Sequence, residues 1–381
     1  MEIQDIRNEI DAIDRELVNL FARRMDICSE IASLKKEKHL PVYDPERERR
    51  KLKEIADMSP SELRDYSLLL YSLIFELSRS YQNRLIGEAG EIAEKIQRAV
   101  ENTDKLFPES ATVACQGVEG SNSQAACDRL FRHANIMYFS DFESVFSAIE
   151  KGLCRYGVVP VENSTAGSVN SVYDLMTHHN FSIVRSIRMK VEHNLLTKPG
   201  VSLSDIREVY SHEQAISQCS DFLRTLKNVK VIPCENTAVA AKMVAESERN
   251  DIAALASRSC MKYYGLKCIE SSVQNTRNNY TRFICISKDT EIYPGADRTS
   301  LMLTLPHEPG SLYRVLAKLN ALNINLNKLE SRPLPGREFE FMFYFDIETP
   351  VYSKRLPELL SELPDACEEF HYLGSYSEVP S

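Results

Sequence analysis

Residues 3–38 read IQDIRNEIDAIDRELVNLFARRMDICSEIASLKKEK, and this stretch decides the architecture of the first part of the chain. Its apolar residues recur at 3, 6, 10, 13, 17 and 20 and again at 27, 31 and 34, which is the spacing of a helical heptad seam. A helix of this length extends about 54 Å, which is longer than a domain of roughly 90 residues is wide. We therefore expect a second copy of the chain to pack along it, in a homodimer or a higher homo-oligomer.

Two shorter helices follow the long one, and each has its own start signal. Asp44-Pro45 supplies an N-cap and a proline at the first position of a helix that runs to about Met58. Ser59-Pro60-Ser61-Glu62 supplies a capping box before the apolar stretch 68–77. Residues 1–88 are thus predicted to form an all-helical domain, and the polar residues 89–109 a linker with some helical character.

From Ala111 onward, short apolar strand candidates alternate with helical stretches, which indicates an α/β domain over 110–290. The strand candidates lie at 112–114, 156–161, 229–232, 252–255 and 283–287. Residues 297–376 show a new order, βαββαβ, which is ferredoxin-like. Its strands are expected at 299–305, 325–332, 338–348 and 367–375, and its helices at 311–322 and 353–363. The predicted fold class is a multidomain chain of α plus α/β type.

Composition excludes several classes of function. With 46 Lys+Arg against 55 Asp+Glu the formal charge is -9, which disfavours nucleic acid as a partner, and no apolar run is long enough to cross a membrane. The ten cysteines form no CxxC pair and no secretory signal is apparent, so we expect a cytoplasmic protein with free thiols and no metal site. No GxGxxG or Walker A loop occurs, and no cofactor is expected.

The helical domain carries a group of basic residues where apolar ones would be expected. Arg24 falls on the heptad seam, Lys35 lies three turns further along nearly the same face, and Arg47 joins them from the second helix. Ser78 and Gln82 share one face of the third helix. One interpretation is a set of internal ion pairs with acids on the other helices. The other is a site for a small dicarboxylate, to which guanidinium groups bind in a bidentate manner.

In order and spacing these residues resemble the site of the all-helical chorismate mutases, and the stretches 17–24 and 41–48 add to the match. The resemblance implies an intertwined dimer that catalyses the Claisen rearrangement of chorismate to prephenate by positioning and electrostatics. It implies that Arg24, Arg47 and Arg7 of the partner subunit clamp the carboxylates, that Lys35 and Gln82 donate to the ether oxygen, and that Glu48 and Asp44 hold the ring hydroxyl. The implied catalytic residues are Arg7, Arg24, Lys35, Arg47, Glu48 and Gln82, with Asp44 and Ser78 binding the substrate.

Three stretches of the α/β domain are rich in hydroxyl and amide side chains: 117–123, 160–168 and 279–283. Each alone is also explained by turn and N-cap chemistry. Together with 156–170 and 210–223 they resemble prephenate dehydratase, which implies two α/β lobes of the periplasmic-binding-protein type with the site between them. The resemblance assigns Thr281 as the hydrogen-bond donor to the leaving hydroxyl, and leaves a proton-transfer role of His212 open. The implied substrate-binding residues are Ser121, Asn163, Ser164, Thr165, Ser168, Ser211, His212, Gln214, Arg282 and Phe283.

The last domain contains a turn at 307–312 and the tetrad Glu330-Ser331-Arg332-Pro333 at a strand end. Turns and strand ends of this kind occur on many surfaces. Paired within a βαββαβ unit, however, they resemble the amino-acid-binding ACT domain that is fused to dehydratases. The resemblance implies that phenylalanine binds at the interface of two such domains and inhibits the enzyme. The implied effector residues are Pro309, Gly310, Ser311, Leu312, Glu330, Ser331 and Arg332.

As a whole, the chain resembles the bifunctional chorismate mutase/prephenate dehydratases, enzymes of phenylalanine biosynthesis that convert chorismate through prephenate to phenylpyruvate. A mutase fused to prephenate dehydrogenase would need a dinucleotide-binding loop, which the sequence lacks. An amino-acid-sensing regulator with a degenerate catalytic half would be expected to have lost site residues, yet Arg24, Lys35, Gln82 and Thr281 are all present.

Overall fold

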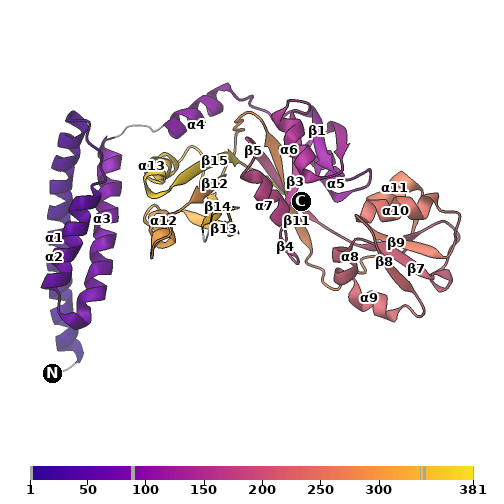
Figure 1. Ribbon diagram of the computed structural model, residues 1–381, viewed down its shortest axis with the longest axis horizontal. Coiled ribbons are helices and arrows are strands. Elements are labelled where there is room, and N and C mark those ends of the chain that lie inside the picture. The colour runs from indigo at the N-terminus through magenta and orange to yellow at the C-terminus, as the bar shows by residue number, and fades with distance from the viewer. Residues whose placement is uncertain (1–2, 87–90, 335, 338–339, 381) are drawn as a thin grey trace. The chain divides into compact units, whose positions relative to one another are not determined.

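The computed structural model describes residues 3–86, 91–334, 336–337 and 340–380. Within these bounds the chain divides into two compact units, Met1–Arg98 with Leu301–Tyr372, and Ala99–Ser300 with Leu373–Ser381. Parts of the predicted linker, Pro335 and the predicted start of the third strand of the last domain lie outside the described residues. Figure 1 labels the elements of both units.

The first unit begins with the predicted helices. α1 spans Ile3–Glu37, α2 spans Pro45–Met58, and α3 spans Arg64–Ile86 after a 3-10 turn at Ser61–Leu63. The side chain of Asp44 caps α2 by accepting from Arg47 N at 3.0 Å, and Pro45 is its first residue, as predicted. A further helix, α4, covers Glu91–Asn102 within the predicted linker.

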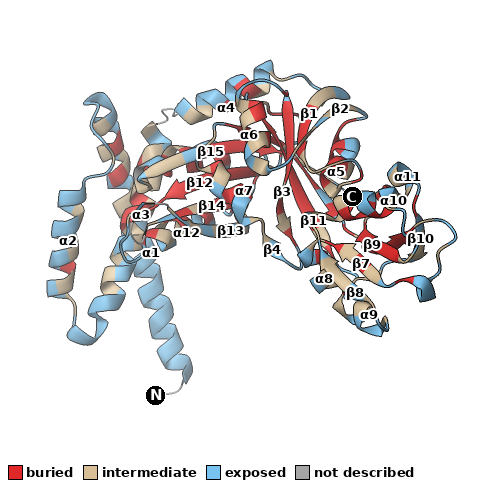
Figure 2. Ribbon diagram, turned by 45° about the vertical axis from the view of Figure 1, so that its right-hand side comes forward, coloured by how far each residue is buried: buried red, intermediate tan, exposed pale blue. Residues whose placement is uncertain are grey.

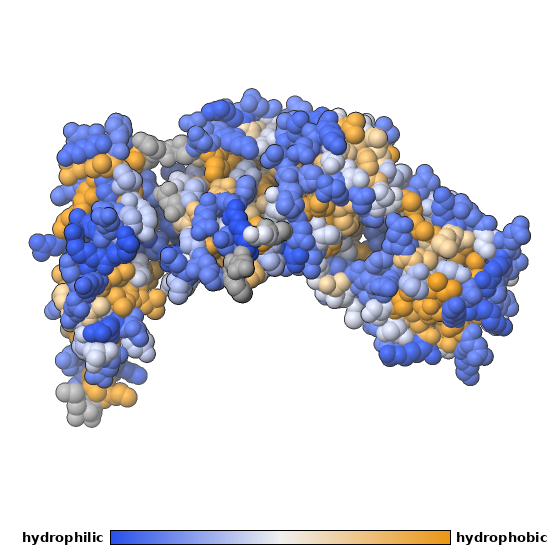
Figure 3. All heavy atoms as spheres, viewed as in Figure 1, coloured by the Kyte–Doolittle hydropathy of each residue, from blue (hydrophilic) through white to orange (hydrophobic). Residues whose placement is uncertain are grey.

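The long helix α1 packs against α3 by one face and leaves its heptad seam uncovered. Cys28 and Ala32 are its buried residues, on the same side as Arg24 and Lys35. The seam residues Ile3, Ile6, Ile10, Ile13, Leu17 and Leu20 are 44–70% exposed. Figure 2 colours most of α1 as exposed. Figure 3 shows apolar residues on the surface of the N-terminal helices.

The second unit contains two sheets. The larger has the order β16-β5-β11-β3-β1-β2, with β4 paired to β3. β1 is parallel to β2 and β3, whereas β11 runs antiparallel to β3 and β5. Its strands are β1 Ser110–Gln116, β2 His133–Phe139, β3 Tyr156–Asn163, β4 Gly167–Ser168, β5 Ser182–Lys190, β11 Tyr280–Ser287 and β16 Glu378–Val379, and its helices are α5 Asn122–Leu130, α6 Phe142–Glu150 and α7 Asn170–Met176.

The smaller sheet has the order β10-β6-β9-β7-β8, and the chain enters it after β5 and leaves it before β11. These two crossings make the unit two-lobed, as predicted. The strands are β6 Asn194–Thr197, β7 Glu208–Ser211, β8 Lys230–Pro233, β9 Ile252–Ala256 and β10 Lys267–Glu270. The helices are α8 Glu213–Gln218, α9 Ser220–Thr225, α10 Thr237–Glu246 and α11 Ser259–Tyr264, with a 3-10 turn at Leu203–Asp205. The central strands of both lobes are buried (Figure 2).

The last segment has the element order βαββαβ that the sequence predicts. The elements are β12 Arg298–Thr304, α12 Ser311–Ala321, β13 Asn325–Pro333, β14 Phe341–Glu348, α13 Arg355–Glu362, a 3-10 turn at Pro364–Ala366 and β15 Glu369–Tyr376. In the sheet order, β13-β14-β12-β15, β14 separates β13 from β12. Gly310, with φ of 86°, caps α12, because this left-handed conformation favours glycine.

Two general properties of the chain agree with its composition. All ten cysteines are free thiols, and seven of them are buried. Among the described residues, no helix combines the length and the apolar character that a membrane span requires.

Candidate active sites

The helical site is built where α1, α2 and α3 meet, and its two central cations have neutral partners. Arg24 Nη1 donates to Ser78 Oγ and lies 3.8 Å from Cys28 Sγ. Lys35 Nζ donates to the carbonyl oxygen of Val42 at 2.6 Å. Within the described part of the chain neither cation forms an ion pair. The interpretation of Arg24 and Lys35 as partners of internal acids is therefore wrong.

Burial tunes the charge of Lys35. Partial burial lowers the pKa of its ammonium group, while Asp44 and Glu48 act in the opposite direction and Arg47 adds to the lowering. The group therefore loses its proton more readily than an exposed lysine. A partly dehydrated cation of this kind interacts strongly with an anionic guest.

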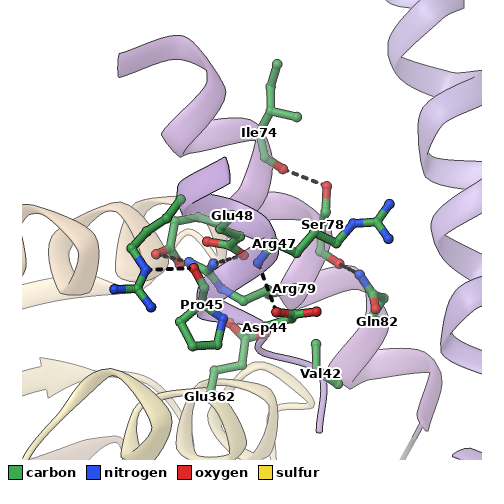
Figure 4. Close-up of polar contacts among 12 residues, drawn as sticks. Val42, Asp44, Pro45, Arg47, Glu48, Ile74, Ser78, Arg79, Gln82 and Glu362 are labelled. Carbon is green, nitrogen blue, oxygen red and sulfur yellow. Dashed lines mark hydrogen bonds and ion pairs between the residues drawn. The ribbon is translucent and has the colours of Figure 1, made fainter. Parts of the chain in front are cut away.

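Ser78 and Gln82 are buried on one face of α3. Ser78 Oγ accepts from Arg24 and donates to the carbonyl oxygen of Ile74 at 2.6 Å, and Gln82 Nε2 donates to the carbonyl oxygen of Ser78 at 3.2 Å (Figure 4). Gln82 Oε1 is buried and has no hydrogen-bond partner among the described residues. A buried amide with an unsatisfied oxygen indicates that this end of α3 is arranged for a further polar group.

Glu48 has a partner that the sequence did not indicate. Its carboxylate pairs with Arg79 of α3, which also pairs with Glu76 and stacks on Tyr43, its guanidinium carbon 5.0 Å from the ring centre. Figure 4 shows Glu48 and Arg79 directed toward one another. Glu48 and Arg79 also border a cavity of about 510 Å³ in the same compact unit, and Pro309 and Gly310 are among its other lining residues.

Two predicted cations are not drawn into this cluster. Arg47 is exposed at the start of α2, where its backbone N–H donates to Asp44 Oδ1 at 3.0 Å. Arg7 is exposed and lies 17 residues before Arg24, which is about 25 Å along the same helix. One copy of the chain therefore does not bring Arg7 to the other predicted site residues.

The second site is a cavity of about 360 Å³ between the two lobes of the α/β unit. Thr281, Phe283 and Asn163 enter it from the larger sheet, and α8 closes it from the smaller lobe. The predicted residues that line the cavity are Ser121, Asn163, His212, Gln214, Thr281 and Phe283.

A hydrogen-bond network fixes the hydroxyl of Thr281 at this cavity. Asn163 Nδ2 donates to Thr281 Oγ1 at 2.9 Å and to Asn279 Oδ1 at 2.7 Å. Asn163 Oδ1 accepts from the backbone N–H groups of Thr165 and Ala166, which fixes the orientation of the amide. Because Thr281 Oγ1 already accepts a hydrogen bond, its own hydrogen is available as a donor.

Gln218 and His193 complete the network, and the sequence reading missed both. Gln218 Nε2 donates to Thr165 Oγ1 at 2.7 Å, and Gln218 Oε1 accepts from Asn279 Nδ2 at 3.1 Å and from His193 Nε2 at 2.9 Å. Burial lowers the pKa of His193, although the bond to Gln218 opposes this. Gln218 follows Gln214 by four residues on α8, so helical spacing could have identified it.

Several predicted substrate contacts need correction. Ser211 is fully buried and donates to the carbonyl oxygen of Leu255 at 2.7 Å, and Ser164 donates to the carbonyl oxygen of Asn278 at 2.9 Å. Both hydroxyls satisfy backbone carbonyls. Arg282 points to the opposite side of β11 from Thr281, because side chains alternate along a strand. The predicted residues outside the cavity lining are Ser164, Thr165, Ser168, Ser211 and Arg282.

His212 lines the cavity in a structural position. It is the N-cap of α8, and its Nδ1 accepts from the backbone N–H of Gln214 at 3.3 Å. This bond leaves Nε2 as the ring atom that can exchange a proton.

The predicted effector residues lie at two places in the last segment. Ser311 Oγ, at the start of α12, accepts from Arg314 at 2.9 Å. Glu330 lies on β13, 3.6 Å from Lys328 Nζ, and Ser331 and Arg332 follow it on the same strand. Because β14 separates β13 from β12, the fold does not place the two groups on adjacent strands. The predicted effector residues near the start of α12 are Pro309, Gly310, Ser311 and Leu312.

Comparison with known proteins identifies two families along the chain. Residues 6–83 match the chorismate mutase type II family, and residues 113–291 match the prephenate dehydratase family. A bifunctional chorismate mutase/prephenate dehydratase of Escherichia coli K12 is 32% identical over 381 residues, which cover 97% of this chain and 95% of the relative.

Two solved structures each resemble 70% of the chain. A prephenate dehydratase of Arthrobacter aurescens in complex with L-Phe has a TM-score of 0.64 at 26% identity, covering 70% of this chain and 89% of that one. A protein described as a novel type of quorum-quenching acylase has a TM-score of 0.65 at 29% identity, covering 70% and 98%. From the two family matches and the full-length relative, the chain belongs to the bifunctional chorismate mutase/prephenate dehydratases, enzymes of phenylalanine biosynthesis that join an isomerase and a lyase in one polypeptide.

Proposed function

We propose that the cluster at α1, α2 and α3 is the mutase site. The observation that carries the proposal is the pairing of Arg24 and Lys35 with neutral groups, because partly buried cations that form no ion pair among the described residues favour an anionic guest. Chorismate, with two carboxylates, supplies that charge. Arg24 and Arg47 bind the carboxylates, and Lys35 and Gln82 donate to the ether oxygen, where negative charge develops as the C–O bond breaks. Gln82 must rotate its amide to do so, because its Nε2 now donates to Ser78.

The mutase site is completed by a second subunit. The exposed apolar seam of α1 is a large uncovered hydrophobic surface, which a second copy of α1 would cover. In such an intertwined dimer, Arg7 of the partner subunit joins Arg24 at the substrate. Glu48 binds the ring hydroxyl after releasing Arg79, with Asp44 and Ser78 beside it.

The cavity around Thr281 is the proposed dehydratase site. Prephenate loses its ring carboxylate as carbon dioxide and its ring hydroxyl as hydroxide, which becomes water on protonation, and the product is the aromatic phenylpyruvate. Thr281 donates a hydrogen bond to the leaving hydroxyl, and Asn163 holds the threonine oxygen in place. Ser121, His212 and Gln214 contact the remaining substrate oxygens from the cavity wall.

The βαββαβ segment is proposed to be a ferredoxin-like ACT module that binds phenylalanine. The L-Phe complex of the Arthrobacter aurescens dehydratase supports this effector. Gly310 to Leu312 contact the amino-acid head group, and Glu330, Ser331 and Arg332 of a second module complete the site. That arrangement agrees with their separation within one sheet. The enzyme is expected to act in the cytoplasm and without a cofactor.

One experiment tests the proposed function. Purified protein is incubated with chorismate, and phenylpyruvate is followed with and without phenylalanine. We expect phenylpyruvate to form without an added cofactor and phenylalanine to slow its formation. Accumulation of prephenate alone, or a rate that phenylalanine does not change, would contradict the dehydratase or the effector assignment, respectively.

A further inference from the structure

Arg282 follows the proposed donor Thr281 in the sequence, but its side chain lies on the opposite face of β11. Thr281 and Phe283 line the cavity, whereas Arg282, 6% exposed, points away from it. The sequence predicts that Thr281, Arg282 and Phe283 act together at one substrate site. The structure divides it into two residues that face the substrate cavity and one that faces another segment of the chain.

That other segment is residues 374–379, which dock on the larger sheet. A Cβ on Gly374 would lie 2.2 Å from the carbonyl oxygen of Ile183, so only glycine permits this approach to β5. Ser186 N donates to Ser377 O at 3.1 Å, and β16 then pairs with β5. The backbone of the 374–379 segment is therefore fixed on the dehydratase sheet.

Two side chains of this segment hold Arg282. Glu378 Oε2 lies 3.1 Å from Arg282 Nε, and the hydroxyl of Tyr376 accepts from Arg282 Nη2 at 3.0 Å. Tyr376 is fully buried, and its hydroxyl also bonds to Ser300 Oγ at 2.7 Å. Arg282 is thus held by an ion pair to Glu378 and by a buried, charge-assisted hydrogen bond to Tyr376, which is stronger than a neutral one.

Glu378 also compensates two further cations. Its Oε1 lies 3.3 Å from Arg188 Nη2 and 3.4 Å from Arg298 Nη2. Arg188 is directly opposite Arg282 in the β5–β11 register, and like charges in that position repel one another. Glu162 is opposite Arg282 on the other side, in β3. Removal of the Glu378 carboxylate would take away one of the acids that balance these arginines.

The strand pairing next to Arg282 is irregular, close to Thr281. The register between β11 and β3 shifts between Arg282 and Phe283, where β3 contains Pro160, which has no N–H to pair. Bulges re-aim neighbouring side chains and weaken the ladder locally. Thr281, just before the shift, directs its hydroxyl to the cavity.

We propose that the 374–379 segment is a positioning element of the dehydratase, in which Glu378 and Tyr376 hold Arg282 and thereby fix the Thr281 hydroxyl toward the substrate. Neither residue touches the substrate. The segment comprises the end of β15, the last strand of the proposed phenylalanine-binding module, and the short strand β16. It is therefore also the route by which a shift of that strand reaches Thr281. This inference rests on the proposed roles of Thr281 and phenylalanine.

The test compares Glu378→Gln with Glu369→Gln in the full-length protein. Glu369 lies on β15 and pairs with Arg337 at 2.6 Å, so its variant removes an ion pair from the same strand. We expect Glu378→Gln to lower the dehydratase kcat between about tenfold and a hundredfold, the effect of misplacing a reacting group, with KM within about twofold of the parent. Mutase activity, measured on the same polypeptide, and both activities of Glu369→Gln should match the parent.

Further variants make the outcomes decisive. Glu378→Asp should recover part of the lost kcat, and Tyr376→Phe, which keeps the ion pair, should give a smaller loss. Glu378→Gln should still bind phenylalanine in calorimetry but respond less to it in the dehydratase assay. Parental kcat, or equal loss of mutase and dehydratase activities, would overturn the proposal. If Thr281→Val is as active as the parent, the dehydratase site assignment itself fails; if only Thr281→Val is impaired, the positioning role alone fails.

Discussion

Lys35 shows how one residue links the fold to the pH dependence of the mutase. Burial lowers the pKa of its ammonium group from 10.5, so the proton is lost at a lower pH than from an exposed lysine. The proposed mechanism needs the ammonium form, which donates to the ether oxygen. Activity should therefore be present at neutral pH and be lost as the pH rises through the lowered pKa.

This argument predicts an alkaline limb in the mutase profile of kcat/KM that begins below the pH expected for an ordinary lysine. Lys35→Arg should move the limb upward, because a guanidinium keeps its proton to about pH 12 or above. The measurement is kcat/KM for chorismate from pH 6 to 10.5 in both proteins. The same limb in parent and variant would exclude Lys35 as its cause.

At the scale of residues, the sequence identified some of the residues that line the cavity but not their partners. Asn163, Thr281 and Phe283 could be placed because they occur in recognisable stretches next to strands. The sequence could not show that Ser164 and Ser211 lie outside the cavity, because a serine hydroxyl can donate a hydrogen bond to a substrate or to a backbone carbonyl equally well. Alternation along a strand could have separated Arg282 from Thr281, but what Arg282 binds depends on a segment almost 100 residues further along the chain.

At the scale of elements, start signals identified the helices better than apolar runs identified the strands. Asp44 and Pro45 fix the start of α2, since capping is a local property of the chain. β2 and β5 were missed because polar side chains interrupt their apolar pattern, as Arg185 and Arg188 do in β5. Pairing with neighbouring strands determines such elements, and one sequence does not reveal it.

The short helix α8 carries its own prediction. Gln218 bonds to Thr165, Asn279 and His193, so it connects the smaller lobe to the Asn163 network. Gln218→Leu should lower the dehydratase kcat/KM roughly five- to a hundredfold, because each buried group left unsatisfied costs about 1–3 kcal/mol. Ser217→Ala, at an exposed position of the same helix, is the matched control. Equal activities of both variants would remove Gln218 from the site.

At the scale of the whole molecule, the exposed seam of α1 is the basis for proposing that the mutase is an assembly of two chains. If Arg7 of one subunit serves the site of the other, Arg7→Ala and Arg24→Ala should complement one another. A heterodimer of the two then contains one site with both arginines and one site with neither. Co-expressed in equal amounts, they should give about one quarter of the parental mutase activity, although each alone is inactive.

Complementation is measured on the co-expressed mixture and on heterodimers purified through two different tags, which should show about one half of the parental activity, with the single variants as controls. If a verified heterodimer recovers no activity, Arg7 does not serve the site of the other subunit. Within one subunit the two arginines lie about 25 Å apart along α1, which is too far for both to contact one substrate.

The central claim is that one polypeptide holds two separate catalytic sites. The most direct test gives chorismate and, separately, prephenate to Arg24→Ala and Thr281→Val, with Arg23→Ala, an exposed neighbour, as control. Arg24→Ala should leave chorismate unchanged yet convert prephenate at the parental rate, and Thr281→Val should turn chorismate into prephenate and stop there. Loss of both reactions in either folded variant, or parental activity of both variants, would contradict the account.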